Sequence, residues 1–305
     1  MGRARRIKRI LLLVLAINFV VAGIKIALGY LFAFGSLLSD GFHALSDGAA
    51  NIVALVGNGY AARSPDKDHP YGYHKHETMA SFFIGAMLFM IAAIIAGNAI
   101  RSLLSSRSPE LDIAAFAGVS ATLLLNIIVA AFEYRLGKKL KSEVLISDSL
   151  HTRGDIFISI GVLASAALIK AGFPRVIDPL LSLVIAGLVF ALFLRIISFS
   201  LPVLLDKKAL DEREVIDIIY KLDDDIIDIH KFRSRGKKNH VYVDFHLITH
   251  GDKTVTETHL LSHRIEDELR RVLKRDIEVI AHIEPREDAN DSRDELIIIE
   301  SEKLG

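Results

Sequence analysis

Long apolar stretches alternate with short polar connections over the first two thirds of the chain. A helix that crosses a hydrocarbon core of about 30 Å needs about 20 mostly apolar residues. Six stretches meet this requirement, at residues 10–34, 36–62, 79–103, 112–134, 144–170 and 176–202. The pattern therefore predicts a polytopic α-helical membrane protein, with six transmembrane helices in a domain that covers residues 1–205.

The pattern changes after residue 205 to that of a small soluble domain. Residues 241–247 and 277–283 alternate between apolar and polar side chains, as half-buried strands do. Residues 211–222 and 261–272 have helical periodicity instead. The second helix is expected to bury Leu261, Ile265, Leu269 and Val272. This order predicts a cytoplasmic α+β domain (α-β-β-α-β, ferredoxin- or metallochaperone-like) over residues 206–288, followed by an acidic tail at 289–305.

Basic residues gather in the connections on one side of the predicted membrane domain. Five precede the first helix, three follow the second and four follow the fourth. The other side has only Arg101, Arg107, Lys170 and Arg175. Because short connections rich in Lys and Arg stay in the cytoplasm, both termini are expected there.

Composition narrows the chemistry that the chain can perform. Hydrophobic residues make up 51% of the chain, and 37 basic residues balance 37 acidic ones, so no affinity for nucleic acid is expected. Cysteine is absent. This excludes disulfides, thiolate nucleophiles and thiolate metal sites, and it leaves His, Asp and Glu as the strong metal ligands.

An Asp-x-x-His-x-x-x-Asp motif occurs twice inside the apolar stretches. Its residues are Asp40, His43 and Asp47 in the second stretch, and Asp148, His151 and Asp155 in the fifth. Residues at i, i+3 and i+7 share one face of a helix. An ionisable side chain at mid-bilayer costs roughly 2.5–3.5 kcal/mol on insertion scales, so a repeated polar stripe indicates a functional site.

The two stripes are expected to face each other near the middle of the membrane. His43, Asp47, His151 and Asp155 could then offer two imidazole nitrogens and two carboxylates in a tetrahedron. This donor set suits zinc well, and cobalt or iron less exclusively.

Two other interpretations concern the same stripes. The polar residues could form helix–helix hydrogen bonds or a buried ion pair with Lys25 or Arg153, although the repeat of the motif argues against this. Asp40 and Asp148 are expected to be either relay groups or structural acceptors.

The sequence around these residues resembles the cation diffusion facilitator family. The resemblance lies in SLLSDGFHALSD (36–47), HPYGYHKHE (69–77) and DSLHTRGD (148–155), and it extends over nearly the whole chain. It implies that His43, Asp47, His151 and Asp155 form the transport site. Family members with His at the first position of both pairs are mostly zinc transporters, so the resemblance favours zinc. The chain lacks the long His-rich loop of many eukaryotic members, which favours a prokaryotic plasma membrane.

The predicted cytoplasmic loop at residues 64–77 is rich in metal ligands. In relatives an Asp and two His of this loop form a second site, and Asp66 and His69 match two of these positions. Tyr73 stands at the third. His74 or His76 could replace it, and a solvated loop without metal remains an equal alternative.

The resemblance also implies a metal site in the soluble domain. It places five residues at positions that bind metal at the dimer interface of relatives, namely His230, His246, His259, His282 and Glu284. The strand pattern agrees in part, since His282 and Glu284 are two residues apart and share a face. Surface histidines are the alternative. Lys75 and Asp206 match a charge pair that holds the helix bundles of relatives together.

These observations predict a homodimeric secondary active transporter, not an enzyme, that exports Zn²⁺ in exchange for protons by alternating access. Zinc requires neutral His and ionised Asp, so metal and protons compete for the same groups. Zinc is expected both as substrate and as a structural or regulatory ion, with Fe²⁺, Mn²⁺, Co²⁺ and Cd²⁺ as other candidates.

Three alternatives remain at this point. One is an Fe²⁺ or Mn²⁺ exporter of the same family, and another is a metal-sensing membrane scaffold that moves no ions. An intramembrane metal-dependent hydrolase is the third, but it would need an open coordination position that four ligands do not leave.

Overall fold

The computed structural model describes residues 2–31, 35–105, 113–174, 176–237 and 240–286. Within these ranges, the side chains of residues 25, 28–29, 31, 35–47, 105 and 113–115 lie outside the description. The predicted acidic tail at 289–305 also falls outside it. The chain divides into two compact units, one up to Leu204 and one from Leu205, and each is described by itself.

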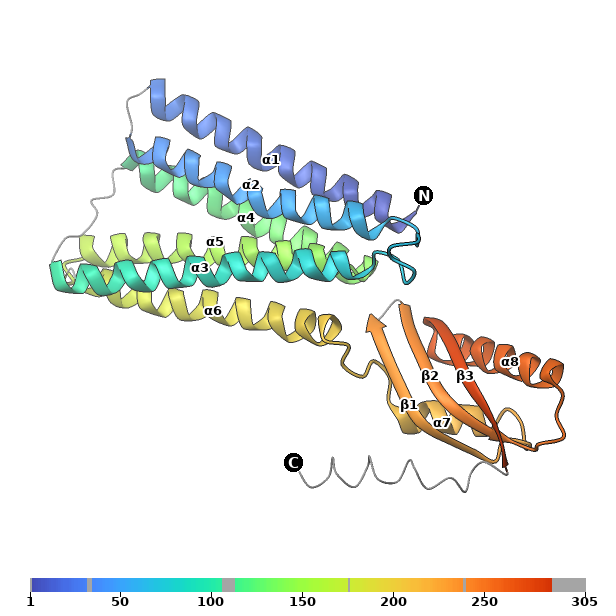
Figure 1. Cartoon of the computed structure of the whole chain (residues 1–305). Coiled ribbons are helices and arrows are strands. Elements are labelled where there is room, and N and C mark those ends of the chain that lie inside the picture. Colours follow the sequence, from blue (N-terminus) through green and yellow to red (C-terminus); the bar gives the residue numbers. More distant parts are fainter. Residues whose placement is uncertain (1, 32–34, 106–112, 175, 238–239, 287–305) are drawn as a thin grey trace. The chain divides into compact units, whose positions relative to one another are not determined.

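Six long helices make up the first unit (Figure 1). They are α1 (Arg3–Leu31), α2 (Gly35–Ala61), α3 (Lys75–Ser105), α4 (Ile113–Leu140), α5 (Glu143–Lys170) and α6 (Ile177–Leu204). In the described part of the chain, five of these helices are long and apolar enough to cross a membrane. The sixth helix, α2, is described with its side chains only from Gly48 onward. The predicted polytopic helical architecture is confirmed.

Several helices extend beyond their apolar stretches. α1 begins at Arg3 instead of residue 10, α3 at Lys75 instead of residue 79, and α4 continues to Leu140 instead of residue 134. Lys and Arg are good helix formers, so the helices continue into the polar connections. The length of an apolar stretch thus reflects the thickness of the bilayer and does not mark where a helix begins or ends. One consequence is that His76, predicted in the loop, lies in the first turn of α3.

The helices pack as antiparallel neighbours, with α1 against α2, α3 against α6, and α4 against α5. The link between α4 and α5 is very short because Lys141 adopts a left-handed conformation (φ 51°) and Ser142 caps α5. α2 also contacts α5. This contact brings the two motif-bearing helices together.

A polar cluster fastens one end of the bundle. The Arg3 guanidinium donates to the Glu77 carboxylate at 3.2 Å and to the carbonyl oxygens of Leu140 and Lys141. The Ser142 hydroxyl donates to the same carboxylate at 2.7 Å. Glu77, the single acidic residue of the HPYGYHKHE segment, therefore joins α1, α3 and the α4–α5 turn.

The second unit is a small α+β domain, as predicted. It contains α7 (Glu212–Tyr220), β1 (Asp228–Lys237), β2 (His240–Thr249), α8 (Val255–Leu273) and β3 (Asp276–Pro285). The sheet order is β1-β2-β3, with β1 antiparallel and β3 parallel to β2.

One face of this sheet packs on the two helices. The apolar core joins residues of α7 and α8 to Val241, Val243, Phe245 and Leu247 of β2. The prediction that α8 buries Val272 is wrong, because Val272 is exposed and Leu273 packs against the core. The spacing of four residues that leads from Leu261 to Leu269 continues to Leu273, which turns Val272 off the buried face.

Candidate functional site

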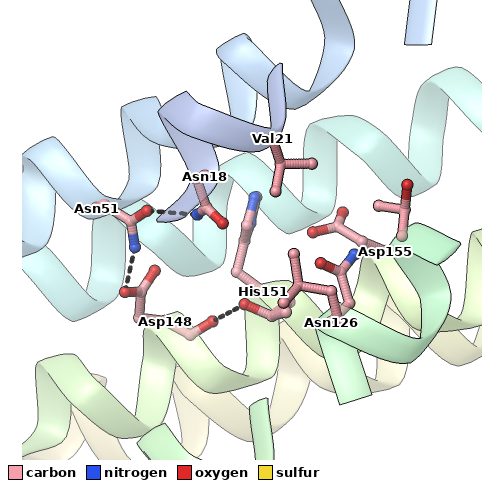
Figure 2. A pocket seen from close by; sticks show the side chains of 10 residues that line it. Asn18, Val21, Asn51, Asn126, Asp148, His151 and Asp155 are labelled. Atoms are coloured by element: carbon pink, nitrogen blue, oxygen red, sulfur yellow. Dashed lines mark hydrogen bonds between the residues drawn. The ribbon is translucent and has the colours of Figure 1, made fainter. Parts of the chain in front are cut away.

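A small cavity lies within the membrane unit, between α1, α2, α4 and α5. Its volume of about 30 Å³ is enough for one or two water molecules or a bare ion. Polar side chains from all four helices surround it (Figure 2). The described lining residues are Asn18, Val21, Asn51, Thr122, Leu125, Asn126, Asp148, His151, Thr152 and Asp155.

A chain of hydrogen bonds crosses three helices at one side of the cavity. The Asn18 amide of α1 donates to Asn51 of α2 at 2.8 Å, and the Asn51 amide donates to the Asp148 carboxylate of α5 at 2.5 Å. Asp148 is almost fully buried, with 1% of its surface exposed. Asp148 thus accepts a hydrogen bond that links α5 to α2, and its role as a relay group or a structural acceptor stays a prediction.

A second buried carboxyl group adjoins this network. Glu133 of α4 has no exposed surface, and its carboxyl group interacts with that of Asp148. Sequence reasoning missed Glu133, because a single acidic residue near the polar end of an apolar stretch carries no periodic signal. Its proximity to Asp148 results from the packing of α4 on α5.

The α5 half of the predicted transport site lines the cavity. His151 is buried, with 3% exposure, and Asp155 is half-buried; both side chains face the same cavity (Figure 2). Asp40, His43 and Asp47 belong to α2, but their side chains lie outside the described residues.

The loop between α2 and α3 is organised around Asp66. One carboxylate oxygen accepts the backbone N–H groups of Asp68 and His69, and the other accepts the Tyr73 hydroxyl at 2.6 Å. The Tyr73 hydrogen bond holds the pKa of Asp66 below its ordinary value, and the same bond raises the pKa of Tyr73.

Two histidine rings lie beside Tyr73. The Tyr73 ring lies 4.2 Å from the ring of His69 and 5.2 Å from that of His76, measured between centroids, whereas His74 is exposed. Tyr73 itself is 8% exposed. The predicted ligands Asp66 and His69 thus lie together, with a tyrosine hydroxyl on the carboxylate that a metal would use.

A histidine row crosses the sheet of the second unit. Strand register pairs His230 of β1 with His246 of β2, and His246 with His282 of β3. The row lies on the face opposite the apolar core, because His246 alternates with the buried residues of β2. Ligand atoms of His230, His246 and Glu284 lie within 4.8 Å of one another. These three groups could hold one metal ion.

The remaining predicted ligands differ in their positions. The His282 ring lies 4.6 Å from the His246 ring, and its Nε2 is 3.6 Å from a Glu284 carboxylate oxygen, so it adjoins the cluster. His259 is exposed on α8, where its ring lies edge-to-face with that of His263.

The two residues of the predicted charge pair belong to different units. Lys75 begins α3 in the first unit, and Asp206 lies in the second, with a carboxylate oxygen 3.9 Å from Arg235. A pairing of Lys75 with Asp206 remains a prediction.

Comparison with known proteins identifies the family. Residues 11–205 match the cation efflux transmembrane domain, and residues 208–286 match the cytoplasmic domain of cation efflux proteins. The chain belongs to the cation diffusion facilitator family. It is a multi-pass membrane protein and a cation efflux transporter, in a family whose members are transporters rather than enzymes.

Individual relatives show the range of ions within this family. The chain is 29% identical to the uncharacterized transporter MJ0449 of Methanocaldococcus jannaschii, over 87% of this chain and 94% of the relative. It is 26% identical to the manganese efflux system protein MneP of Bacillus subtilis, over 91% and 96%. The zinc transporter ZitB of Pectobacterium atrosepticum is 34% identical over 50% of this chain and 48% of the relative. The family is therefore established, and these relatives handle different metals.

Proposed function

We propose that this facilitator exports Zn²⁺ in exchange for protons, and that His43, Asp47, His151 and Asp155 form the transport site. The observation that carries the proposal is the hydrogen bond between Asn51 and Asp148, because it fixes the register of α2 against α5. Both residues are one helical turn from a proposed ligand.

Helix geometry relates the two halves of the site. Asp47 and His43 precede Asn51 by four and eight residues, or about 6 and 12 Å along α2. His151 and Asp155 follow Asp148 by three and seven residues, or about 4.5 and 10.5 Å along α5. Since the two helices are antiparallel, both pairs lie on the same side of the Asn51–Asp148 bond.

The resulting heights support one shared site. Asp47 lies within about 1.5 Å of the level of His151, and His43 within about 1.5 Å of the level of Asp155. A donor set of two imidazoles and two carboxylates suits a tetrahedral zinc ion. The small cavity beside His151 and Asp155 gives such an ion space.

Proton exchange follows from the ligand chemistry. Zinc binds neutral imidazole and ionised carboxylate, so protons that reach the site from the outer face compete with the metal and release it. At the inner face, a higher pH and cytoplasmic metal restore the loaded state. Alternating access then requires only that the helices open the cavity to one side at a time.

Mn²⁺ or Fe²⁺ is the second candidate substrate. Two observations favour it: a manganese efflux relative aligns over 91% of this chain, and three asparagine side chains line the cavity, namely Asn18, Asn51 and Asn126. Carboxylate and amide oxygens suit harder ions such as Mn²⁺. Initial transport rates at equal free concentrations of Zn²⁺, Mn²⁺ and Fe²⁺ distinguish the two candidates.

The test of the site is zinc flux into proteoliposomes under a pH gradient, with a pH-sensitive dye that follows protons in the opposite direction. Asp47→Ala and Asp155→Ala are expected to reduce the flux to that of protein-free liposomes. Asp178→Asn, which changes a membrane-unit carboxylate that accepts the Ser165 hydroxyl, is the matched control and should transport.

Three results would contradict the proposal. Folded Asp47→Ala and Asp155→Ala variants that transport zinc at the parent rate would exclude the site. Zinc flux without proton counterflow would exclude antiport. A parent protein that binds zinc and moves no ion would be a metal-sensing scaffold.

We further infer that the transporter is a homodimer with both termini in the cytoplasm. Support comes from the basic residues of the N-terminal segment and from the match of the second unit to the family's cytoplasmic domain. The chain has no cysteine, so Arg5→Cys introduces a single thiol. An impermeant maleimide should label it in inside-out vesicles, and labelling in right-side-out vesicles would reverse the assigned orientation.

A further inference from the structure

Three cationic side chains from three helices converge on one tyrosine of the membrane unit. Arg195 of α6 donates to the Tyr134 hydroxyl of α4 at 3.1 Å. The guanidinium carbon of Arg153, on α5, lies 4.4 Å from the centroid of the Tyr134 ring, and the ammonium of Lys138 lies 4.7 Å from it. Arg195 and Lys138 are exposed, and the other two side chains are half-buried.

All four residues lie toward the same end of the helix bundle. α4 ends where α5 begins, and α6 is antiparallel to α5, so Leu140, Glu143 and Leu204 mark one side of the membrane unit. At 1.5 Å per residue, Tyr134, Arg153 and Arg195 lie about 9, 15 and 14 Å from these ends.

These depths place the cations near a headgroup region. The 28 residues of α5 extend about 42 Å, so about 6 Å projects beyond each face of a 30 Å hydrocarbon core. The Cα atoms of the two arginines then lie within about 10 Å of the core boundary. Long basic side chains extend from such depths to the interface.

The cluster carries an excess of positive charge. Among the described residues, the side-chain contacts of these three cations are with Tyr134, and none is an ion pair with a carboxylate. The adjoining surfaces of α4 and α6 expose Phe132 and Leu194, which suits contact with acyl chains. Three like charges around one ring repel one another unless an anion lies among them.

We propose that Lys138, Arg153, Arg195 and Tyr134 form a binding site for the phosphate of an anionic phospholipid. Phosphate is the anion that a bilayer presents at this depth, and basic pockets between transmembrane helices are suited to it. Arginine can donate two parallel hydrogen bonds to phosphate oxygens. This site is separate from the transport cavity, and its assignment does not depend on which ion is exported.

The experiment measures lipid binding to the full-length protein in neutral detergent by native mass spectrometry. The parent should bind phosphatidylglycerol more tightly than phosphatidylcholine. An Arg153→Gln and Arg195→Gln double variant is expected to bind phosphatidylglycerol roughly 30-fold more weakly, and Lys138→Gln about fivefold more weakly. Lys138 is exposed in the last turn of α4, so its variant tests the site even if the double variant fails to fold.

Lys139→Gln is the matched control. It removes an exposed positive charge five residues after Tyr134, on a different face of α4, and should leave phosphatidylglycerol binding unchanged. Equal affinity of the parent for the two lipids would overturn the proposal, and so would parent-like binding by the folded variants.

Two further outcomes would reassign the cluster. Inorganic phosphate that binds as tightly as phosphatidylglycerol would make it a site for a free anion. If the double variant binds lipid like the parent but no longer forms a dimer in lipid-free detergent, the cluster is a contact between two copies of the protein. Either result would overturn the lipid assignment.

Discussion

Among single residues, Tyr73 has the clearest effect on local chemistry. It stands where the family resemblance places a metal ligand, and its hydroxyl donates to Asp66. Because this bond lowers the pKa of Asp66, it stabilises the loop at pH values above the ordinary pKa of an aspartate. That contribution is lost as the pH falls through the lowered pKa.

Replacing Tyr73 with histidine should therefore create a loop metal site. Tyr73→His removes the hydroxyl from Asp66 and supplies a nitrogen ligand beside Asp66 and His69. The zinc stoichiometry, measured by equilibrium dialysis, should rise by one ion per chain. Tyr71→His, in the same loop at an exposed position, should not change it. An unchanged stoichiometry in Tyr73→His would show that the loop cannot hold zinc.

Asn51 is the residue that couples α2 to α5. Asn51→Ala leaves the buried Asp148 carboxylate without its amide donor, which should cost about 1–3 kcal/mol of stability. We also expect slower transport, because the register of the two helices that carry the proposed ligands depends on this bond. Thermal unfolding in detergent and proteoliposome flux are the measurements. Asn98→Ala, at an exposed position of α3, serves as the comparison, and equal effects of the two changes would refute the coupling.

At the level of secondary structure elements, a close approach joins α2 to α3. A Cβ atom at Gly57 would collide with the Cβ of Ala80 and would lie 3.1 Å from the carbonyl oxygen of His76. Neither neighbour is the end of a flexible side chain, so the helices would have to move apart.

Gly57→Ala should therefore destabilise the membrane unit by about 1–3 kcal/mol. Gly59 provides a control in the same helix, since a Cβ there would meet nothing within 4 Å. Gly59→Ala is expected to be neutral or stabilising because alanine favours helices. Matching unfolding temperatures for the two variants would disprove the predicted contact.

For the whole molecule, the division into two units predicts that the second unit folds independently. The second unit has its own apolar core, with Val215, Phe245 and Ile265 among its buried residues. Residues 205–286 produced alone should give a cooperative thermal transition with α+β circular dichroism. A non-cooperative transition would contradict this expectation.

Zinc should stabilise this domain through the histidine row. At a free concentration 100 times Kd, zinc should add about 2.7 kcal/mol to the free energy of unfolding of the domain. His246→Ala should abolish the stabilisation, measured as a shift of the unfolding temperature. His263→Ala, an exposed position on α8, should retain it. Equal shifts for the two variants would place the zinc elsewhere.

The sequence alone determined the membrane class, the two-part organisation and the polar residues of α5 that line the cavity. These follow from local rules, because each apolar stretch must match the bilayer, and an Asp or His inside such a stretch is costly wherever the helix packs. The alternation of β2 likewise assigned His246 to the face opposite the core.

Only the tertiary structure decided which distant groups meet. Glu133 lies near Asp148, the Tyr73 hydroxyl donates a hydrogen bond to Asp66, and Tyr134 contacts cationic side chains of α5 and α6. Each contact depends on how one element packs against another, and the histidine row depends on strand register. Hydrophobic periodicity specifies which face of a helix or strand is buried. It does not specify which residue of a neighbouring element lies opposite that face, and the polar contacts of this transporter depend on those pairings.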